Sequence, residues 1–308
     1  VITSDRLRRD TMELKHLRAF VALAEELHFG RAAQRLCIVQ PALSMQIKAL
    51  EEELEVRLFE RDRHNVALSD TGRLFLPEAR ATLHQAMRAE QTARLSARGE
   101  IGVLRIAFVS SVLPKLLPDL IRSMHARYPL ITLELKDMTT PEQIAALHGN
   151  KLDFGLIRMP VSGAGLETRI VLEESFVVAV PEDHALAAKP LIHPTDLSGS
   201  PAFVLSRRYA PGFYDEMLVA LTQQGAMLDI AQELGEFPTM LALVAAGLGI
   251  GVIPAAAALA LPPKVVARPL DLPGHRTGIG LAYTRLDSAA KRVLFEVMMQ
   301  SVGDASDN

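Results

Sequence analysis

The segment from Leu27 to Glu60 restricts the fold of this chain more than any other. Two short helical patterns meet at a tight break at residues 37–39. The second pattern places its large aliphatic residues on one helical face: Leu43, Ile47, Leu50 and Leu54. In the first pattern, the small residues Ala32 and Ala33 let two helices approach closely. The pair predicts a helix-turn-helix, and the alternative is two helices of an ordinary bundle.

The opposite face of the second helix carries short polar side chains. It holds Gln40, Ser44, Gln46 and Lys48, and Pro41 starts the helix with a preset φ. Such side chains match the donors and acceptors that base edges present in the major groove. We therefore predict that all five residues form a DNA-binding face.

The net charge of −3 does not by itself indicate nucleic-acid binding. Cations nevertheless gather near the predicted helices, at Arg31, Arg35, Arg61 and Arg63. The last two fall in Leu58–Ser69, which lacks a helical period and predicts a two-stranded wing. Arginines placed in this way supply salt-dependent phosphate contacts to double-stranded DNA. The alternative for each one is a solvated surface charge.

Four motifs in fixed order resemble the LysR-type transcriptional regulators: AAQRL, QPALS, QIKALEEEL and RLFER. The similarity continues over nearly the whole chain from Met12. Val39, Met45 and Glu55 depart from it, because many members carry Ser, Arg and Gly there. The resemblance implies an N-terminal winged helix-turn-helix, a long linker helix, and an α/β effector domain of two periplasmic-binding-protein-like lobes. It also implies a homotetramer, and we expect an activator. The single cysteine, Cys37, fits a cytoplasmic protein.

The predicted domain limits follow changes in the sequence pattern. We expect a disordered leader (1–11), a DNA-binding domain (12–70), a linker helix (71–98), and an effector domain (101–302) with lobe I at 101–174 and 276–302 and lobe II at 175–275.

The linker helix has an apolar seam at heptad-like spacing: Leu76, Ala79, Leu83, Ala86 and Ala93. Such a helix needs a partner, so it predicts a dimer. The alternative is a helix packed on its own domain. Pro77 predicts a kink.

Strands and helices alternate from Ile101 onward. The order strand, helix, strand, helix, strand over Val103–Ile157 predicts a parallel sheet with right-handed crossovers. Phe176–Val180 is expected to cross into the second lobe, and Gly278–Tyr283 to return. The run GLGIGVIP at residues 247–254 follows a helix and feeds a strand. It therefore predicts a tight turn and not a dinucleotide loop, which would follow a strand.

A small-molecule site is predicted where the strands of the first lobe end, because ligands bind beyond the carboxyl ends of strands in open α/β sheets. Candidate effector-binding residues are Ser110, Ser111, Thr140, Arg158 and, from the second lobe, Phe213. Hydroxyls, a guanidinium and an aromatic ring favour a small organic-acid effector. The alternative for Ser111 and Thr140 is simple helix capping.

The segments CIVQPALS, VSSVLP and TTPEQI resemble those of family members that control the breakdown of aromatic compounds. In those members, the Ser, Thr and Pro-x-Phe positions line the effector cleft. This similarity points to an aromatic carboxylate or a muconate-like diacid as the effector.

Other function classes find little support. Cys37 is the single cysteine, so we expect no intrachain disulfide, and its apolar neighbours predict a buried thiol. The nine histidines are scattered, so no metal site or cofactor is expected. Ser110 lacks a nucleophile elbow, so no catalytic residue is assigned and no enzyme is expected. No long apolar run predicts a membrane span.

Two hypotheses therefore stand. The first is a regulator that binds double-stranded DNA as a dimer, with further pairing to a tetramer, under control of an organic acid. The second is a solute-binding or enzymatic α/β protein with an incidental helical head. The second predicts turnover, or ligand binding without DNA affinity.

Overall fold

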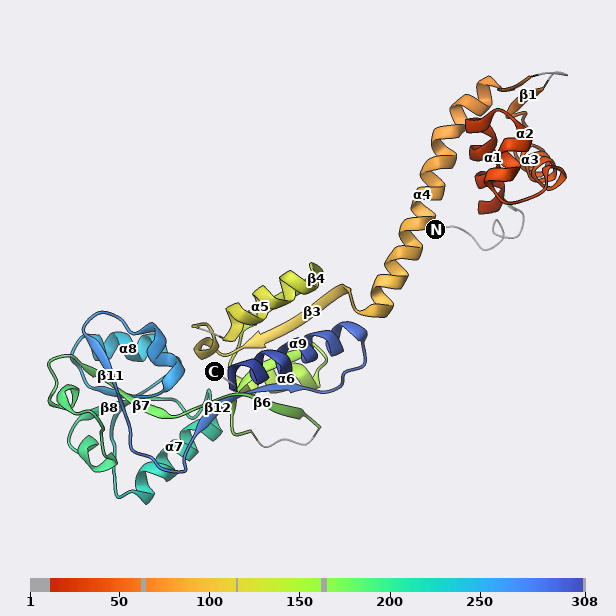
Figure 1. Ribbon diagram of the computed structural model, residues 1–308. Coiled ribbons are helices and arrows are strands. Elements are labelled where there is room, and N and C mark those ends of the chain that lie inside the picture. The colour runs from red at the N-terminus through yellow and green to blue at the C-terminus, as the bar shows by residue number, and fades with distance from the viewer. Residues whose placement is uncertain (1–11, 62–64, 115, 162–164, 307–308) are drawn as a thin grey trace. The chain divides into compact units, whose positions relative to one another are not determined.

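The computed structural model describes residues 12–61, 65–114, 116–161 and 165–306 (Figure 1). The predicted leader and Arg63 lie outside these ranges. The chain divides into two compact units, Val1–Arg94 and Leu95–Asn308. Within the described ranges, no helix combines the length and the apolarity that a membrane crossing requires.

The first unit contains the helix-turn-helix and its wing. Its elements are α1 (Leu14–Glu26), α2 (Phe29–Arg35), α3 (Gln40–Leu54), β1 (Phe59–Arg61), β2 (Val66–Leu68) and most of α4 (Asp70–Arg98). The strands pair antiparallel, with Phe59 opposite Leu68, as the wing prediction requires. Aliphatic residues of α1 and α3 close the core around Phe20, whose ring contacts those of Phe59 and Phe75.

The turn between α2 and α3 corrects one prediction. Cys37 has a left-handed φ of 54° and its side chain is exposed, so the prediction of a buried thiol is wrong. The neighbours Leu36 and Ile38 are partly buried against the core of this unit. The turn directs those two side chains inward and the cysteine outward.

The helix α4 runs without interruption through Pro77 for 29 residues. Pro77 lies inside the helix and removes the hydrogen bond that an N–H there would donate to the Arg73 carbonyl, yet the residues on both sides of it stay helical. Along this helix, the residues buried in the described chain are Gly72 and Ala79, both close to the first-unit core. Leu76, Ala79 and Leu83 of the predicted dimer seam pack against the core of their own unit, so this part of the seam follows the alternative of a helix packed on its own domain. Most of the remaining helix surface is exposed in a single chain.

The second unit contains two five-stranded sheets. The first has the order β4-β3-β5-β12-β6 and comprises β3 (Ile101–Phe108), β4 (Leu130–Asp137), β5 (Phe154–Met159), β6 (Glu167–Glu174) and β12 (Thr277–Tyr283). The second has the order β11-β7-β10-β8-β9 and comprises β7 (Phe176–Pro181), β8 (Pro201–Leu205), β9 (Asp229–Leu234), β10 (Ile250–Pro254) and β11 (Val265–Pro269). The chain passes between the sheets twice, from β6 to β7 and from β11 to β12 (Figure 1).

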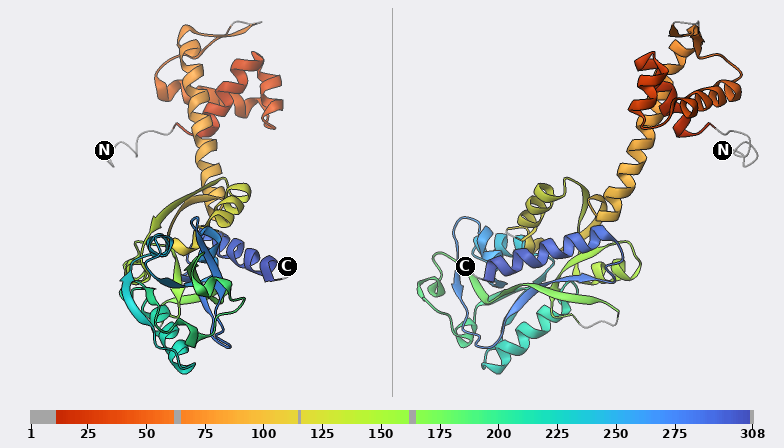
Figure 2. Two further views of the ribbon diagram at one scale, coloured as in Figure 1. Left: turned by 90° about the vertical axis from the view of Figure 1, so that its left-hand side faces the viewer. Right: turned by 45° about the vertical axis from the view of Figure 1, so that its right-hand side comes forward.

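Each sheet carries its own helices and its own buried core. In lobe I, α5 (Leu116–Arg127) and α9 (Ala289–Ser306) contact each other and cover one face, while α6 (Thr140–His148) packs on β5 (Figure 2). In lobe II, α8 (Phe237–Ala245) packs on β7 and β10, and α7 (Pro211–Gln223) contacts β5 of lobe I. The two lobes therefore meet at the carboxyl end of β5.

The predicted order of elements is largely confirmed. Strands β3, β4 and β5 are parallel, and Gly247, with a φ of 74°, sits in the turn from α8 to β10. The sequence did not reveal β6. Its residues ETRIVLEE include four charged side chains, because it is an edge strand with one solvated face.

A tight approach in the first unit gives a testable prediction for Gly72→Ala. Alanine normally stabilises a helix relative to glycine. A Cβ at position 72 would lie 2.1 Å from the Leu58 carbonyl oxygen, so this change should instead destabilise the unit by about 1–3 kcal/mol. Hydrogen-exchange mass spectrometry on α1–α3 peptides of the full chain measures the loss.

The matched control is Gly30→Ala in α2. A Cβ there meets the side chain of His28 at 3.0 Å, and displacing that side chain would cost at most its one capping hydrogen bond from the Arg31 N–H. The helix preference of alanine over glycine offsets that loss. Exchange in α1–α3 should stay at the wild-type rate or slow. Equal acceleration by both substitutions would contradict the prediction.

Candidate functional site

The exposed face of α3 is centred on a different set of residues from the predicted one. Leu43, Ile47 and Leu50 are fully buried. At roughly 100° per residue, the opposite side of the helix carries Pro41, Met45, Lys48 and Glu52, all of which are exposed.

The five predicted residues of α3 divide around this exposed face. Gln40, Pro41 and Lys48 are exposed, whereas Ser44 and Gln46 are half-buried on its flanks. Met45, which the sequence analysis noted as a departure from the family pattern but did not include in the DNA-binding face, lies near its centre with 72% of its surface exposed. A helical-wheel projection from the buried positions would have found it.

Two of the predicted cations of the first unit, Arg31 and Arg35, contact Glu25 and Glu26 at the end of α1. Arg31 donates through its side chain to the backbone oxygen of Glu26 at 2.6 Å. Arg35 lies 2.7 Å from a carboxylate oxygen of Glu25. Arg61 ends β1 opposite Val66 in the wing. All of the ion pairs involving Arg31 and Arg35 are at the surface, where such pairs are worth little and exchange readily.

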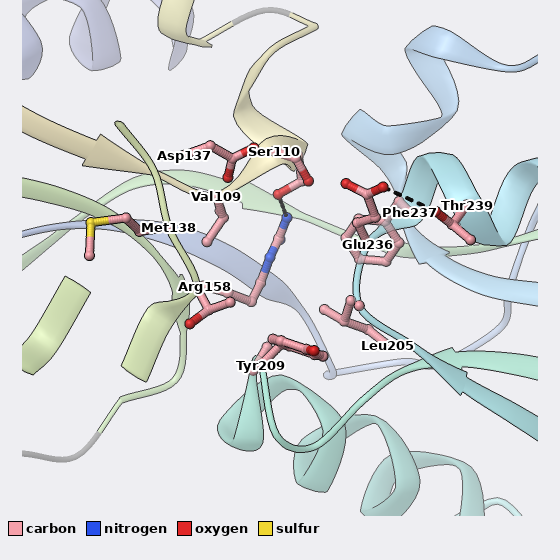
Figure 3. Close-up of a pocket in the computed structure, with 14 residues that line it drawn as sticks. Val109, Ser110, Asp137, Met138, Arg158, Leu205, Tyr209, Glu236, Phe237 and Thr239 are labelled. Atoms are coloured by element: carbon pink, nitrogen blue, oxygen red, sulfur yellow. Dashed lines mark hydrogen bonds between the residues drawn. The ribbon is translucent and has the colours of Figure 1, made fainter. Parts of the chain in front are cut away.

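A cavity of about 410 Å³ opens between the two lobes of the second unit (Figure 3). Its lining comes from strand ends in both lobes, as the rule for open α/β sheets requires. Lobe I contributes Val109, Ser110, Ser111, Asp137, Met138, Thr139 and Arg158. Lobe II contributes Leu205, Tyr209, Ala210, Gly235, Glu236, Phe237 and Thr239.

Three of the five predicted effector residues line this cavity, and two do not. Ser110, Ser111 and Arg158 line it. Thr140 is buried, and its hydroxyl accepts a hydrogen bond from the Arg158 backbone N–H at 3.1 Å. It is Thr139 that faces the cavity, and its hydroxyl forms a capping box with Glu142 at the start of α6.

The structure also contradicts the prediction that Phe213 lines the effector cavity. Its ring is fully buried in the lobe II core, in contact with the rings of Phe176 and Phe237. It lies in the first turn of α7, and that turn faces the core. The aromatic residues that line the cavity are Phe237 and Tyr209. The same strand-end rule applied to β8 and β9 would have indicated both.

The guanidinium of Arg158 forms a buried ion pair. Its Nη1 donates to Glu174 Oε1 at 2.7 Å and its Nη2 to Ser111 Oγ at 2.5 Å. It also lies 5.5 Å from the centroid of the Phe213 ring. Arg158 is 2% exposed, and its Nε has no hydrogen-bond partner among the described residues. Burial lowers the pKa of Arg158, and Glu174 opposes that effect.

Glu174 joins this pair to the crossover between the lobes. It ends β6, directly before the chain enters lobe II at β7. Its second oxygen accepts a hydrogen bond from the Ala256 backbone N–H of lobe II at 2.6 Å. One carboxylate therefore links the floor of the cavity to both lobes.

The mouth of the cavity is acidic. Asp137 ends β4 in lobe I, and Glu236 precedes α8 in lobe II, where its carboxylate accepts from the Thr239 hydroxyl at 3.0 Å (Figure 3). Burial, followed by the nearby charges of Glu236 and Glu142, raises the pKa of Asp137. The Arg158 charge is balanced by Glu174, so the lining carries a net negative charge.

Comparison with known families fits this architecture. Residues 14–73 match the bacterial regulatory helix-turn-helix proteins of the lysR family, and residues 97–302 match the LysR substrate binding domain. The second match covers more than half of the chain, which therefore belongs to the LysR family of transcriptional regulators. The predicted resemblance is confirmed, and the family consists of regulators and not enzymes.

Individual relatives agree with this assignment. The chain is 39% identical over 245 residues to the uncharacterized HTH-type transcriptional regulator YnfL of Escherichia coli (strain K12), covering 79% of this chain and 82% of that one. It is 35% identical over 260 residues to the HTH-type transcriptional regulator AlsR of Bacillus subtilis (strain 168), covering 84% and 86%.

Solved structures give the same result. The crystal structure of CbnR, a LysR family transcriptional regulator, matches with a TM-score of 0.85 and 27% identity, covering 93% of this chain and 100% of CbnR. Full-length CbnR in complex with its target DNA matches with a TM-score of 0.84 and 27% identity, covering 94% and 100%. The chain is thus a DNA-binding transcription regulator with an effector-binding domain.

The buried ion pair gives a stability prediction for Glu174→Ala. Removal of the carboxylate leaves the guanidinium of Arg158 buried and without a countercharge, which should cost about 3–5 kcal/mol. All four tyrosines lie in the second unit, so urea unfolding followed by tyrosine fluorescence reports on that unit alone.

Glu173→Ala is the matched control one residue away. Glu173 lies 4.0 Å from Arg276, and both side chains are more than half exposed. Its removal should leave the urea midpoint nearly unchanged. A Glu174 variant as stable as the Glu173 variant would show that the buried pair adds nothing.

The raised pKa of Asp137 predicts how Asp137→Asn changes stability with pH. A carboxyl whose pKa rises on folding binds its proton more tightly in the folded chain, so wild type loses stability as pH rises from the ordinary value of 3.8 through the raised one. Asn does not titrate. The variant should therefore be more stable than wild type at pH 7, with the gain vanishing towards pH 4. Thermal unfolding across this range measures it.

Asp153→Asn should show the opposite sign. Burial alone would raise the pKa of Asp153, but hydrogen bonds from Arg105 and Lys291 outweigh it and lower that pKa. Its charge therefore stabilises the fold at neutral pH, and this benefit is lost as pH falls. If both variants changed the stability at pH 7 in the same direction, the opposite pKa shifts of Asp137 and Asp153 would be contradicted.

Proposed function

We propose that this chain activates transcription as a cytoplasmic tetramer of paired dimers, and that a small organic acid in the cavity between the lobes controls how it binds DNA. The acid is an aromatic carboxylate or a muconate-like diacid. The limits of the DNA-binding, linker and effector domains stay as predicted from the sequence.

The unpartnered Nε of Arg158 carries the proposal of an acid. A buried donor without an acceptor costs about 1–3 kcal/mol, and a ligand carboxylate would supply the acceptor. The Ser110 hydroxyl also lines the cavity, with no hydrogen bond to another described residue. Together they favour a carboxylate at the lobe I end of the cavity.

The remaining lining favours the aromatic carboxylate over the diacid. Phe237 and Tyr209 offer apolar ring surface. Asp137 and Glu236 face the same space, so a second ligand carboxylate near them would meet two like charges. A single acidic group on an apolar body avoids this repulsion.

On the DNA side, we propose that α3 enters the major groove while the cations around it contact phosphates. The contacting residues are Arg31, Arg35, Gln40, Pro41, Ser44, Gln46, Lys48, Arg61 and Arg63.

The helix α4 would pair two chains, because several of its apolar residues, including Leu74 and Met87, are exposed to solvent in a single chain.

Control by the effector follows from the position of the cavity. Its lining comes from both lobes, so the ligand binds most tightly in one arrangement of them. A ligand shifts a conformational equilibrium only through such a difference in affinity. The proposed consequence is a change in the spacing of the two DNA-binding units of a dimer.

The test is a thermal-shift titration of the full chain with benzoate and with cis,cis-muconate. Benzoate should raise the tyrosine-reported melting temperature, since a ligand at 100 times its Kd adds about 2.7 kcal/mol. Ser110→Ala should reduce the shift, and Ser198→Ala, on the lobe II surface, should not. Asp137→Asn should strengthen muconate binding more than benzoate binding.

DNase footprints with and without the stabilising acid test the regulatory half. The footprint or the DNA bend should change when the acid is added. Stabilisation by amines instead of acids, or an acid that binds and leaves the footprint unchanged, would refute the proposal.

A further inference from the structure

The exposed stripe of α3 has an unusual chemical character. Pro41 begins it, Met45 follows one turn later, and Lys48 comes one turn after that. Met45 is 72% exposed and Val39, at the N-cap, is 69% exposed. The outward side of this helix therefore starts with three apolar side chains, and its first side-chain cation is Lys48.

Packing does not account for Met45. The core of the first unit uses the opposite stripe of α3, and Met45 does not belong to it. Lys48 pairs at 3.3 Å with Glu52, which lies one turn further from Met45 along the same face, so the charged group of Lys48 does not cover the methionine. The side chain is free to meet whatever the helix face contacts.

The chemistry of the major groove limits what Met45 can recognise. A thioether has no hydrogen to donate, so it cannot satisfy the acceptors of guanine or adenine. Thymine alone among the bases presents a methyl group in this groove. Methionine is flexible and polarizable, which lets it pack on such a group.

We propose that Met45 is a specificity-determining residue that packs on the C5-methyl group of a thymine in each half-site. The inference rests on the proposed placement of α3 in the major groove. Pro41 is the neighbour that supports this apolar contact. The operator should therefore contain an A·T pair at the position under the centre of α3.

The experiment begins with selection of a binding site from a random duplex library by the full-length wild-type protein. Each thymine of the selected site is then replaced by deoxyuridine, which lacks only the methyl group. Replacement of the contacted thymine in a single half-site should weaken wild-type binding about fourfold, the effect of one buried methyl. For Met45→Ala, the same replacement should have no effect.

Two further variants keep the result interpretable. Met45→Leu retains an apolar side chain and should keep the sensitivity to deoxyuridine. Met227→Ala removes another exposed methionine, in lobe II, and should behave as wild type. Hydrogen exchange in α1–α3 identifies any variant that fails to fold. If Met45→Ala does not fold, Met45→Ser takes its place as the variant that should not respond to deoxyuridine.

The outcomes separate the two levels of the proposal. Equal sensitivity to deoxyuridine in wild type and Met45→Ala would assign the methyl contact to another residue and overturn the inference. So would a selected site in which no thymine responds. Failure to select any site would instead refute the placement of α3 in the groove.

Discussion

The ion pair between Arg158 and Glu174 is the interaction on which the effector domain depends. A buried pair of charges is costly to desolvate, and further hydrogen bonds to the two groups offset part of that cost. Here Glu174 accepts from the Ala256 N–H, and the guanidinium donates to Ser111. These partners come from a strand end, a crossover and the second lobe, so the pair fixes three parts of the domain at one point.

The pair also determines the electrostatics of the cavity. An arginine at a strand end suggests a free positive charge, but Glu174 balances it, and Asp137 and Glu236 leave the cavity mouth negative. The donors that remain for a ligand are directional groups, the Arg158 Nε and the Ser110 hydroxyl. Recognition of an acid would therefore rely on hydrogen bonds to one carboxylate more than on net charge.

Sequence reasoning recovered what local patterns encode. The periodicity of Leu43, Ile47 and Leu50 fixed the buried face of α3, and strand ends located the lobe I side of the cavity. It could not recover pairings between residues far apart in the chain. Glu174 lies 16 positions from Arg158 on a strand that carries too many charges to be recognised. The predicted exposures of Cys37 and Phe213 were wrong because local backbone geometry sets the direction of each side chain. Cys37 lies in the turn between α2 and α3, and Phe213 lies in the first turn of α7.

The DNA-binding face shows a second limit of prediction from the sequence, which is the choice of residues by polarity alone. Polar residues were chosen there because they can form hydrogen bonds with bases, and this choice excluded Met45 on chemical grounds. The phase of the helix, set by the three buried aliphatic residues, puts Met45 on the outward side whatever its polarity. Geometry therefore decides which side chains can reach a groove, and chemistry decides only what they recognise there. When the exposed side of α3 is found first, Met45 enters the DNA-binding face. The base expected under it is then thymine, which offers a methyl group, and not a base recognised through hydrogen bonds.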